Sequence, residues 1–257
     1  MGTLVMFHAH PDDEAISTAG TMAKAASDGH RVVLVTATRG EHGEVVDGVL
    51  RPGESLGDRR VHELTRAAEI LGVARVEFLG YVDSGMIGTP ENDAPECFWQ
   101  ADVEEAAQRL AAILLAEGAD VLTIYDAHGT YGHPDHMKVH IVGVRAGAIA
   151  GTPKVYESVV DREAVNSMFE RMHEMGVEMP VDIDLATFGV PHELITTSVD
   201  VTAFADQKRT VMAAHESQIP PDSFFLTLTP DTFAEAFGKE HFVLRGAKPG
   251  SLETQLI

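Results

Sequence analysis

Short apolar runs that alternate with segments of helical periodicity constrain the fold of this chain more than any other feature of its sequence. The predicted strands are residues 3–8, 31–36, 75–79, 121–125 and 154–158. The predicted helices between them are residues 15–26, 58–71, 102–117 and 134–150. Strands that are joined by helices pair in parallel through right-handed crossovers. The sequence therefore predicts an α/β fold with a doubly wound, mostly parallel, Rossmann-like sheet.

The helix predicted over residues 102–117 illustrates how these segments pack. Its apolar residues recur at three- and four-residue spacing and share one face: Val103, Ala106, Ala107, Leu110, Ile113 and Leu114. The opposite face carries Glu104, Glu105, Gln108 and Arg109. A helix with one apolar stripe buries that stripe against a core. We therefore expect this helix to cover one face of the sheet.

The alternation becomes less regular after about residue 160. Three elements and a turn are expected there: a helix over 162–175, an extended segment over 195–199, a helix over 204–215 and a turn at Pro220-Pro221. No repeat, low-complexity segment or Pro/Gly/Ser-rich linker divides the chain. We predict a single domain over residues 1–257, in which a core of about residues 1–160 is joined by a less regular portion, residues 161–257, that completes the active site.

Composition and the start of the chain restrict partners and location. The formal net charge of −21 disfavours nucleic acid as a partner, because phosphates are bound by clustered Lys and Arg. No run approaches the roughly 20 apolar residues that a bilayer span requires, so a membrane partner is not expected. The start carries no basic segment of a secretory signal, and Cys97 is the single cysteine. We predict a cytoplasmic protein; a homo-oligomer remains open.

Two loops with the sequence His-Pro-Asp follow predicted strands. Residues 8–14 read His-Ala-His-Pro-Asp-Asp-Glu, and residues 131–136 read Tyr-Gly-His-Pro-Asp-His. Active sites of open α/β sheets lie outside the carboxyl ends of the strands, which is where both loops are expected. The first loop lacks the glycine-rich turn of a dinucleotide site, and its carboxylates would repel a pyrophosphate. Imidazole and carboxylate instead favour zinc, held by two His and one Asp with an open position for water.

The remaining groups in the loops can supply proton transfer and charge stabilisation. The side chains of adjacent Asp12 and Asp13 diverge, so one can bind metal while the other accepts a proton from water. His133 can donate a hydrogen bond to the oxyanion that forms when water attacks an amide carbonyl, with Asp135 holding its imidazole. Either loop alone could be only a turn with a helix cap, but two at corresponding strand ends favour catalysis.

Four motifs identify a resemblance that covers residues 3–150. They are Ala-His-Pro-Asp-Asp-Glu at 9–14, Gly-Glu-His-Gly-Glu at 40–44, Asp-Ser-Gly-Met at 83–86 and Gly-His-Pro-Asp-His at 132–136. The chain resembles the LmbE-like, or PIG-L, family of N-acetylglucosaminyl deacetylases, especially its mycothiol branch, which contains a deacetylase and a conjugate amidase. Ala-His-Glu-Ser-Gln-Ile at 214–219 is similar to a segment that lies close to the active site in that branch.

The resemblance implies a zinc-dependent hydrolase that cleaves the N-acyl amide of an N-acetylglucosamine-type substrate. It implies that His10, Asp13 and His136 are the ligands of the zinc ion. Iron(II) can also occupy a site with these ligand types. Asp12 becomes the general base, and His133 the oxyanion stabiliser. The residues implied for substrate binding are Arg60, Asp83, a mobile Tyr131 and His215. His128 and Thr130 depart from the Asn-Gly-Gly-Tyr-Gly pattern that the family has in this loop.

Several alternatives remain open on the sequence alone. The substrate could instead be a thiol conjugate cleaved by a mycothiol S-conjugate amidase, or the chain could be a non-catalytic sugar-binding module. Phosphoester cleavage is less favoured, because a three-ligand site lacks the bridging carboxylates of a two-metal clamp. Purely structural roles are also open for several residues: a buried hydrogen-bonded His8, an orienting or capping Glu14, a solvent-facing Arg60, a turn at Asp83 and a helix cap at His215.

Overall fold

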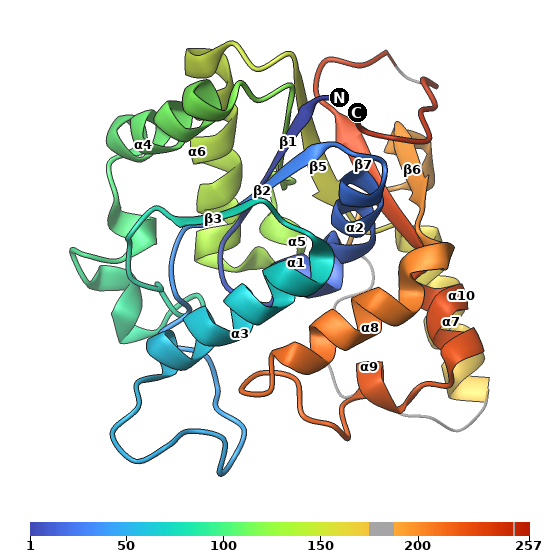
Figure 1. Ribbon diagram of the computed structural model, residues 1–257, viewed down its shortest axis with the longest axis horizontal. Helices are drawn as coiled ribbons and strands as arrows, with labels where there is room; N and C mark the ends of the chain where they lie inside the picture. The colour runs from blue at the N-terminus through green and yellow to red at the C-terminus, as the bar shows by residue number, and fades with distance from the viewer. Residues whose placement is uncertain (175–187, 249) are drawn as a thin grey trace.

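A single mostly parallel sheet organises the computed structural model, which describes residues 1–174, 188–248 and 250–257. Over these residues the strand order is β3-β2-β1-β4-β5-β7-β6 (Figure 1). The strands are β1 (Thr3–His8), β2 (Arg31–Thr36), β3 (Arg75–Phe78), β4 (Val121–Tyr125), β5 (Lys154–Val159), β6 (Thr197–Asp200) and β7 (Lys239–Leu244). Strands β1 to β5 pair in parallel, so the predicted doubly wound α/β class is confirmed.

Strand β7 was not predicted from the sequence, and neither were the short helices in the loop after β4 and after residue 223. Strand β7 pairs antiparallel with β5 on one side and with β6 on the other. Its side chains alternate, with Glu240 and Phe242 buried and Lys239 exposed. A six-residue strand with lysine, glutamate and histidine in it has too weak an apolar pattern to be recognised alone. Its pairing with β5 brings the C-terminal portion into the same sheet.

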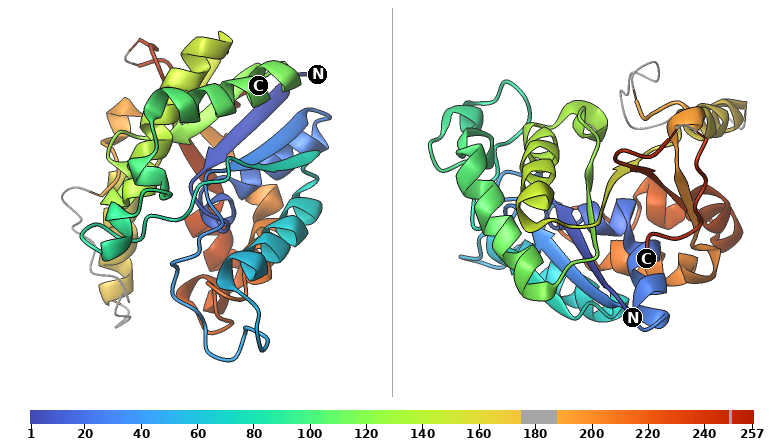
Figure 2. Two further views of the ribbon diagram at one scale, coloured as in Figure 1. Left: turned by 90° about the vertical axis from the view of Figure 1, so that its left-hand side faces the viewer. Right: turned by 90° about the horizontal axis from the view of Figure 1, so that it is seen from above.

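The helices form two layers, one on each face of the sheet (Figures 1 and 2). One layer contains α4 (Val103–Glu117) and α6 (Pro134–Ala150). The other contains α2 (Ala19–Ser27), α3 (Leu56–Leu71) and α8 (Ala205–Ala214). Further helices are α1 (Asp13–Ser17), α5 (Gly129–Gly132), α7 (Arg162–Glu174), α9 (Phe224–Thr227) and α10 (Pro230–Phe237). The predicted helix over 162–175 ends at Glu174, and residue 175 lies outside the described residues.

Strand β1 shows why two helical layers are required. All six of its residues are buried. Leu4 and Met6 belong to the core that includes α2, α3 and α8, whereas Val5 and Phe7 belong to the core that includes α4 and α6. Because successive side chains of a strand point to opposite faces, a strand that is apolar throughout needs cover on both.

Two predicted helix boundaries were wrong for local reasons. The predicted helix over 15–26 is divided at Thr18, whose backbone (φ −140°, ψ 5°) leaves the helical region between α1 and α2. The Thr18 hydroxyl lies 2.9 Å from Nε2 of His8. Helix α3 begins two residues before the predicted Asp58, because the side chain of Ser55 caps it by accepting a hydrogen bond from the Asp58 backbone N–H at 3.1 Å. The predicted stop at Gly72 is confirmed by its φ of 73°.

A buried ion pair fastens the C-terminal portion to the core. Lys208 on α8 and Glu240 on β7 are 2.6 Å apart, and each side chain is 2% exposed. The Glu240 carboxylate also accepts hydrogen bonds from the backbone N–H groups of Gly20 and Thr21, at 2.9 and 2.8 Å. These groups belong to the first turn of α2, where a helix favours negative charge. One carboxylate therefore links three elements that are far apart in the sequence. That residues 1–257 form one domain stays a prediction.

Replacement of Glu240 by alanine should lower the free energy of unfolding by about 3–5 kcal/mol, because it leaves the ammonium of Lys208 buried without its partner. Urea denaturation followed by circular dichroism measures this loss. Glu104→Ala is the matched control, since it removes an ion pair with Arg145 in which both side chains are 49% exposed. The control should cost less than about 1 kcal/mol. Equal losses of stability in the two variants would show that the buried ion pair stabilises the fold no more than the exposed one.

Candidate metal centre

Strand order brings the two His-Pro-Asp loops together. The order reverses between β1 and β4, so the helices that follow these strands cross to opposite faces of the sheet (Figure 2). Open α/β sheets have a crevice at such a point, outside the carboxyl ends of the strands. Residues 9–13 follow β1, and residues 126–136 follow β4. Both predicted loops therefore border this crevice.

The carboxylate of Asp13 lies between two imidazoles. Its Oδ2 is 3.5 Å from Nδ1 of His10, and its Oδ1 is 3.3 Å from Nε2 of His136. The backbone N–H of His10 also donates to Oδ2 at 2.8 Å. Burial disfavours charge on both groups, yet the imidazoles hold the pKa of Asp13 well below its usual range, and the carboxylates around His10 raise the pKa of that ring well above its usual value. The structure thus brings the three predicted ligands together.

A third imidazole, that of His133, joins this group. Nitrogen atoms of His10, His133 and His136 lie within 4.8 Å of one another, a second combination that could hold an ion. A third combination is His10 with Asp83 and Asp135. All three sets share His10 and lie at one place. The first set, His10, Asp13 and His136, has two imidazoles and one carboxylate, which is a donor set of catalytic zinc sites. The residues present therefore fit a divalent metal ion.

The His136 ring is held mainly by stacking. It lies on the Tyr125 ring with a centroid distance of 4.4 Å and an interplanar angle of 16°. Its Nδ1 atom is buried and has no hydrogen-bond partner among the described residues. The Tyr125 hydroxyl in turn lies 2.7 Å from Nδ1 of His8. His8, which is 1% exposed and bonded through both ring nitrogens, has the structural environment considered for it from the sequence.

Asp135 differs from its prediction in what its carboxylate contacts. The sequence analysis expects this carboxylate to hold the imidazole of His133. In the structure the carboxylate accepts hydrogen bonds from the backbone and hydroxyl of Ser84 and lies 3.1 Å from Nε2 of His10. Asp83 approaches the same nitrogen at 3.5 Å. The expectation was wrong because Pro134 starts α6, and the helical backbone turns the Asp135 side chain toward Ser84 and His10. Asp135 therefore orients a predicted metal ligand.

His133 is oriented by a backbone group instead. The N–H of Asp135 donates to Nδ1 of His133 at 3.1 Å, as His133 caps the start of α6. A nitrogen that accepts this bond carries no proton, so the neutral ring has its proton on Nε2. Burial, together with the neighbouring His10 and His136, lowers the pKa of His133 to about 4. A neutral His133 with a free Nε2–H suits hydrogen-bond donation to an oxyanion.

Asp12 has an unusual backbone conformation. Its φ is 110° and its ψ is −26°, a backbone conformation that residues other than glycine rarely adopt. Its Oδ1 lies 3.0 Å from Nη2 of Arg60. Partial burial raises the pKa of Asp12, although the Arg60 guanidinium opposes the rise. The carboxylate is therefore paired and oriented, and still basic enough to accept a proton.

Arg60 is buried, not solvent-facing. It is 3% exposed, and its guanidinium donates to the backbone carbonyls of Gly40 and Pro11 as well as to Asp12. A Cβ atom at Gly40 or Gly43 would lie 2.3 or 2.6 Å from Nη1 of Arg60. The glycines of the Gly-Glu-His-Gly motif therefore leave room for this guanidinium. The substrate-binding role of Arg60 stays a prediction.

The other predicted substrate residues have different surroundings. Asp83 is buried, and its oxygens accept hydrogen bonds from the backbone N–H groups of His42 and Gly85. Tyr131 is 49% exposed, with its hydroxyl 3.5 Å from Nε2 of His136, so it can meet a substrate at the mouth of the site. His215 is fully buried and bonded to Glu14. Substrate-binding roles for these residues stay predictions.

The structure adds two supporting residues that the sequence reasoning did not single out. Ser84 holds Asp135, and Tyr125 supports the ring of His136. Ser84 stands within the motif at 83–86, so its motif membership was the available signal. Tyr125 is the last residue of an apolar strand, and nothing in that pattern distinguishes it from a core residue.

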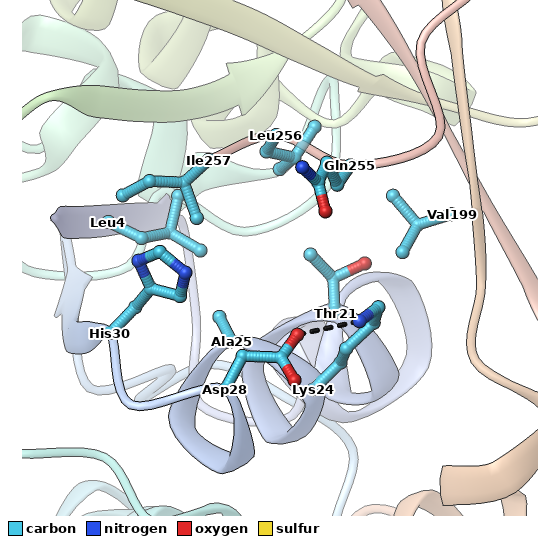
Figure 3. A pocket seen from close by; sticks show the side chains of 10 residues that line it. All are labelled: Leu4, Thr21, Lys24, Ala25, Asp28, His30, Val199, Gln255, Leu256 and Ile257. Carbon is cyan, nitrogen blue, oxygen red and sulfur yellow. Dashed lines mark hydrogen bonds and ion pairs between the residues drawn. The ribbon is translucent and has the colours of Figure 1, made fainter. Parts of the chain in front are cut away.

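A shallow pocket lies at the other end of the sheet (Figure 3). It is lined by residues of β1, of α2 and the turn after it, of β6 and of the last three positions: Leu4, Thr21, Lys24, Ala25, Asp28, His30, Val199, Gln255, Leu256 and Ile257. Lys24 and Asp28 within it form an ion pair of 2.6 Å. The metal-ligand groups lie at the carboxyl ends of the strands, so this pocket is separate from them.

No helix within the described residues is long and apolar enough to cross a membrane.

Comparison with known proteins places this site in a family. Residues 5–146 match the family described as PIG-L, GlcNAc-PI de-N-acetylase. The chain is 41% identical over 257 aligned positions to a 1D-myo-inositol 2-acetamido-2-deoxy-alpha-D-glucopyranoside deacetylase of Acidothermus cellulolyticus, with 94% of this chain and 88% of that protein covered. The predicted family is confirmed.

Solved structures share the fold at low identity. The N,N'-diacetylchitobiose deacetylase of Pyrococcus horikoshii has a TM-score of 0.62 at 20% identity, covering 96% of this chain and 84% of that one. A 4-carboxy-2-hydroxymuconate hydratase of Pseudomonas putida has a TM-score of 0.58 at 18% identity, covering 96% and 98%. Because one fold serves a deacetylase and a hydratase, the activity must be argued from the site.

Replacement of Asp135 by asparagine should weaken metal binding by about 10- to 100-fold, because the carboxylate orients His10. Competition with a chromophoric zinc chelator measures the affinity. Asp126→Asn is the control, since Asp126 accepts the backbone N–H groups of His128 and Thr130 in the same loop. It should leave metal affinity within about twofold of wild type. An unchanged affinity in Asp135→Asn would contradict the orienting role.

Metal affinity should rise with pH through the neutral range. The carboxylates around His10 raise its pKa in the metal-free protein, and a metal ligand must be deprotonated. Below the raised pKa, binding releases this proton, so affinity increases by up to about tenfold per pH unit; above it the dependence flattens. Calorimetric titrations in two buffers of different ionisation enthalpy measure the proton released. An affinity that is constant between about pH 6 and pH 8 would refute this assignment.

Proposed function

The chain belongs to the PIG-L family of GlcNAc-PI de-N-acetylases, and we propose that it is a metal-dependent deacetylase that hydrolyses the N-acetyl amide of an amino sugar. One observation carries the proposal: the Asp13 carboxylate contacts both His10 and His136, directly beside Asp12. This grouping provides a metal site and a base at one place. In metal-assisted amide hydrolysis the two act together, because water must be activated and the amide nitrogen must be protonated before it leaves as a neutral amine.

His10, Asp13 and His136 would hold the metal ion, with zinc as the first candidate and iron(II) as the second. A bound ion of this kind polarises the amide carbonyl and lowers the pKa of water. This set is preferred over His10, His133 and His136 because the Asp13 carboxylate contributes negative charge to the ligand set. It also leaves His133 free to act on the substrate.

Asp12 would accept a proton from the attacking water. Its Oδ1 is held by Arg60, which fixes the direction of the carboxylate. After the tetrahedral intermediate has formed, the same carboxyl group would return the proton to the nitrogen, so that the C–N bond breaks and the amine leaves neutral. The products are acetic acid, which ionises to acetate by losing a proton, and a primary amine. The raised pKa of Asp12 suits a group that both accepts and delivers a proton.

His133 would stabilise the oxyanion. Its Nδ1 accepts the Asp135 backbone N–H, so its Nε2–H is available for the developing charge. A pKa of about 4 keeps the ring neutral over the physiological range, and the ring therefore acts as a hydrogen-bond donor throughout. Such a donor, held in place before the reaction, contributes about 3–4 kcal/mol to lowering the barrier.

The proposed substrate is 1D-myo-inositol 2-acetamido-2-deoxy-α-D-glucopyranoside, the compound that the Acidothermus relative is named for. Support comes from 41% identity over nearly the whole chain. The alternative substrate is a thiol conjugate related to mycothiol, cleaved at the corresponding amide. A non-catalytic sugar-binding module is less favoured, because the chain retains His10, Asp12, Asp13, His133 and His136.

Replacement of Asp12 by alanine should lower kcat by about 10²- to 10⁴-fold while one metal ion per chain remains bound, because Asp12 supplies proton transfer and not ligation. Amine release and metal analysis on the same sample measure the two properties. Asp28→Ala, which removes a surface carboxylate paired with Lys24, is the control and should retain wild-type kcat. Wild-type turnover in Asp12→Ala would show that another group is the base.

A substrate panel tests the function directly. Release of primary amine is measured for N-acetylglucosamine, the N-acetylated glucosaminyl-inositol and a mycothiol S-conjugate, with metal-loaded and chelated protein. We expect metal-dependent release, fastest with the glucosaminyl-inositol. Fastest release from the S-conjugate would favour the amidase alternative, and no release from any amide would favour the binding module.

A further inference from the structure

Glu14 and His215 form a buried pair next to the proposed base. Both side chains are fully buried, and Oε1 of Glu14 lies 2.6 Å from Nε2 of His215. The second oxygen of Glu14, Oε2, accepts the backbone N–H of Asp12 at 2.9 Å. The pair thus connects the C-terminal portion of the chain to the peptide group of the residue that carries the base.

The backbone of Asp12 needs such support. A residue other than glycine at a φ of 110° costs on the order of 1–3 kcal/mol and persists only when its surroundings fix it. The Asp12 carbonyl accepts the N–H groups of Ala15 and Ile16 at 3.0 and 3.3 Å, so it is fixed by the first turn of α1. The Asp12 N–H is fixed by Glu14. Loss of that acceptor would allow the residue to relax toward negative φ.

The turn that carries His215 is itself anchored beside Arg60. His215 is the C-cap of α8, and Ser217 donates to Glu63 through its N–H at 3.0 Å and its hydroxyl at 2.6 Å. Glu63 stands three residues after Arg60 on α3, so the two lie on neighbouring turns of one helix. The turn therefore fixes the position of His215 relative to the helix that carries Arg60, the partner of Asp12.

Among the described residues, Glu14 is the one hydrogen-bond partner of the His215 imidazole. Its Nδ1 is buried and has no hydrogen-bond partner among residues 1–174, 188–248 and 250–257. The ring has no exposed surface, so its side chain contacts only other protein groups. Its hydrogen bond holds Glu14, and Glu14 in turn holds the backbone of Asp12. The charges of His215 and Asp12 also interact directly.

From this geometry we infer that Glu14 and His215 are positioning residues for the base: they hold the strained Asp12 backbone so that its carboxylate meets Arg60 and faces the reacting water. The inference rests on the proposed function for the role of Asp12. It assigns His215 a part in catalysis through Glu14, and it gives the C-terminal portion a defined contribution to the active site.

Kinetics of Glu14→Gln, His215→Gln and the double variant test this inference. We expect kcat on the amide substrate to fall by about 10- to 100-fold in each, because a displacement of about 1 Å of a catalytic group has effects of this size. KM should stay within about twofold, and one metal ion should remain bound per chain. Because the two residues act as one unit, the double variant should lose no more than about the larger single loss.

Glu240→Gln is the matched control, since it disturbs another buried ion pair without contact to the loop of Asp12. It should lose stability but keep wild-type kcat. A proportional fall of kcat and stability in all variants, the control included, would reduce the pair to a structural role. Wild-type kcat in both Glu14→Gln and His215→Gln would overturn the inference.

Crystal structures of the metal-loaded wild type and of Glu14→Ala, which removes the acceptor for the Asp12 N–H altogether, provide a readout that is independent of activity. In the variant, Asp12 should leave its positive φ, and the 3.0 Å contact between its Oδ1 and Arg60 should be lost. An Asp12 that keeps its conformation in the variant would refute the positioning role. If the wild type hydrolyses no amide, the proposed function fails, while these structures still decide whether the pair positions Asp12.

Discussion

The parallel pairing of β1 with β4 is the constraint on which the rest of the site depends. Leu4, Val5 and Met6 pair with Val121, Leu122 and Thr123, so the two strands run side by side and end at the same edge. The chain leaves β1 toward one face and β4 toward the other, and the two loops border the place where it diverges. His10 and Asp13 come from the first loop, and His136 from the second. These three residues meet because the loops that carry them follow β1 and β4, which are neighbours in the described sheet.

A centre this rich in charge is stable only because each group has a partner. Burial of an unpaired charge costs several kcal/mol, so the carboxylates occur with cations, imidazoles or N–H donors. Asp12 has Arg60, Asp13 has His10 and His136, and Glu14 has His215. Asp135 is satisfied by Ser84. The pairing explains why the pKa of Asp13 falls and that of His10 rises despite burial, which keeps the Asp13 carboxylate ionised.

Backbone strain is concentrated in the same two loops. Among the described residues, the non-glycine residues with positive φ are Asp12, at 110°, and Thr130, at 66°. Asp12 carries the proposed base, and Thr130 directly precedes Tyr131 at the mouth of the site. Strain of this kind persists where surrounding contacts determine the conformation, and it is common at functional sites. Thr130 is also one of the departures from the family pattern, so the strain there is a property of this chain.

The sequence by itself determined the fold class and the bounds of β1, β2, β4 and α6, and it singled out the residues that meet in the candidate metal centre. It could do so because apolar periodicity reports burial directly, and because His-Pro-Asp motifs at strand ends are local signals. Only the tertiary structure decided that Asp135 orients His10, that Arg60 faces Asp12 and that His215 reaches Glu14 from 201 residues away. These contacts depend on the direction of side chains and on the packing of α3 and α8 against the first loop. Strand β7 was decided in the same way, since its pairing with β5 and β6 is a long-range interaction that its own six residues do not encode.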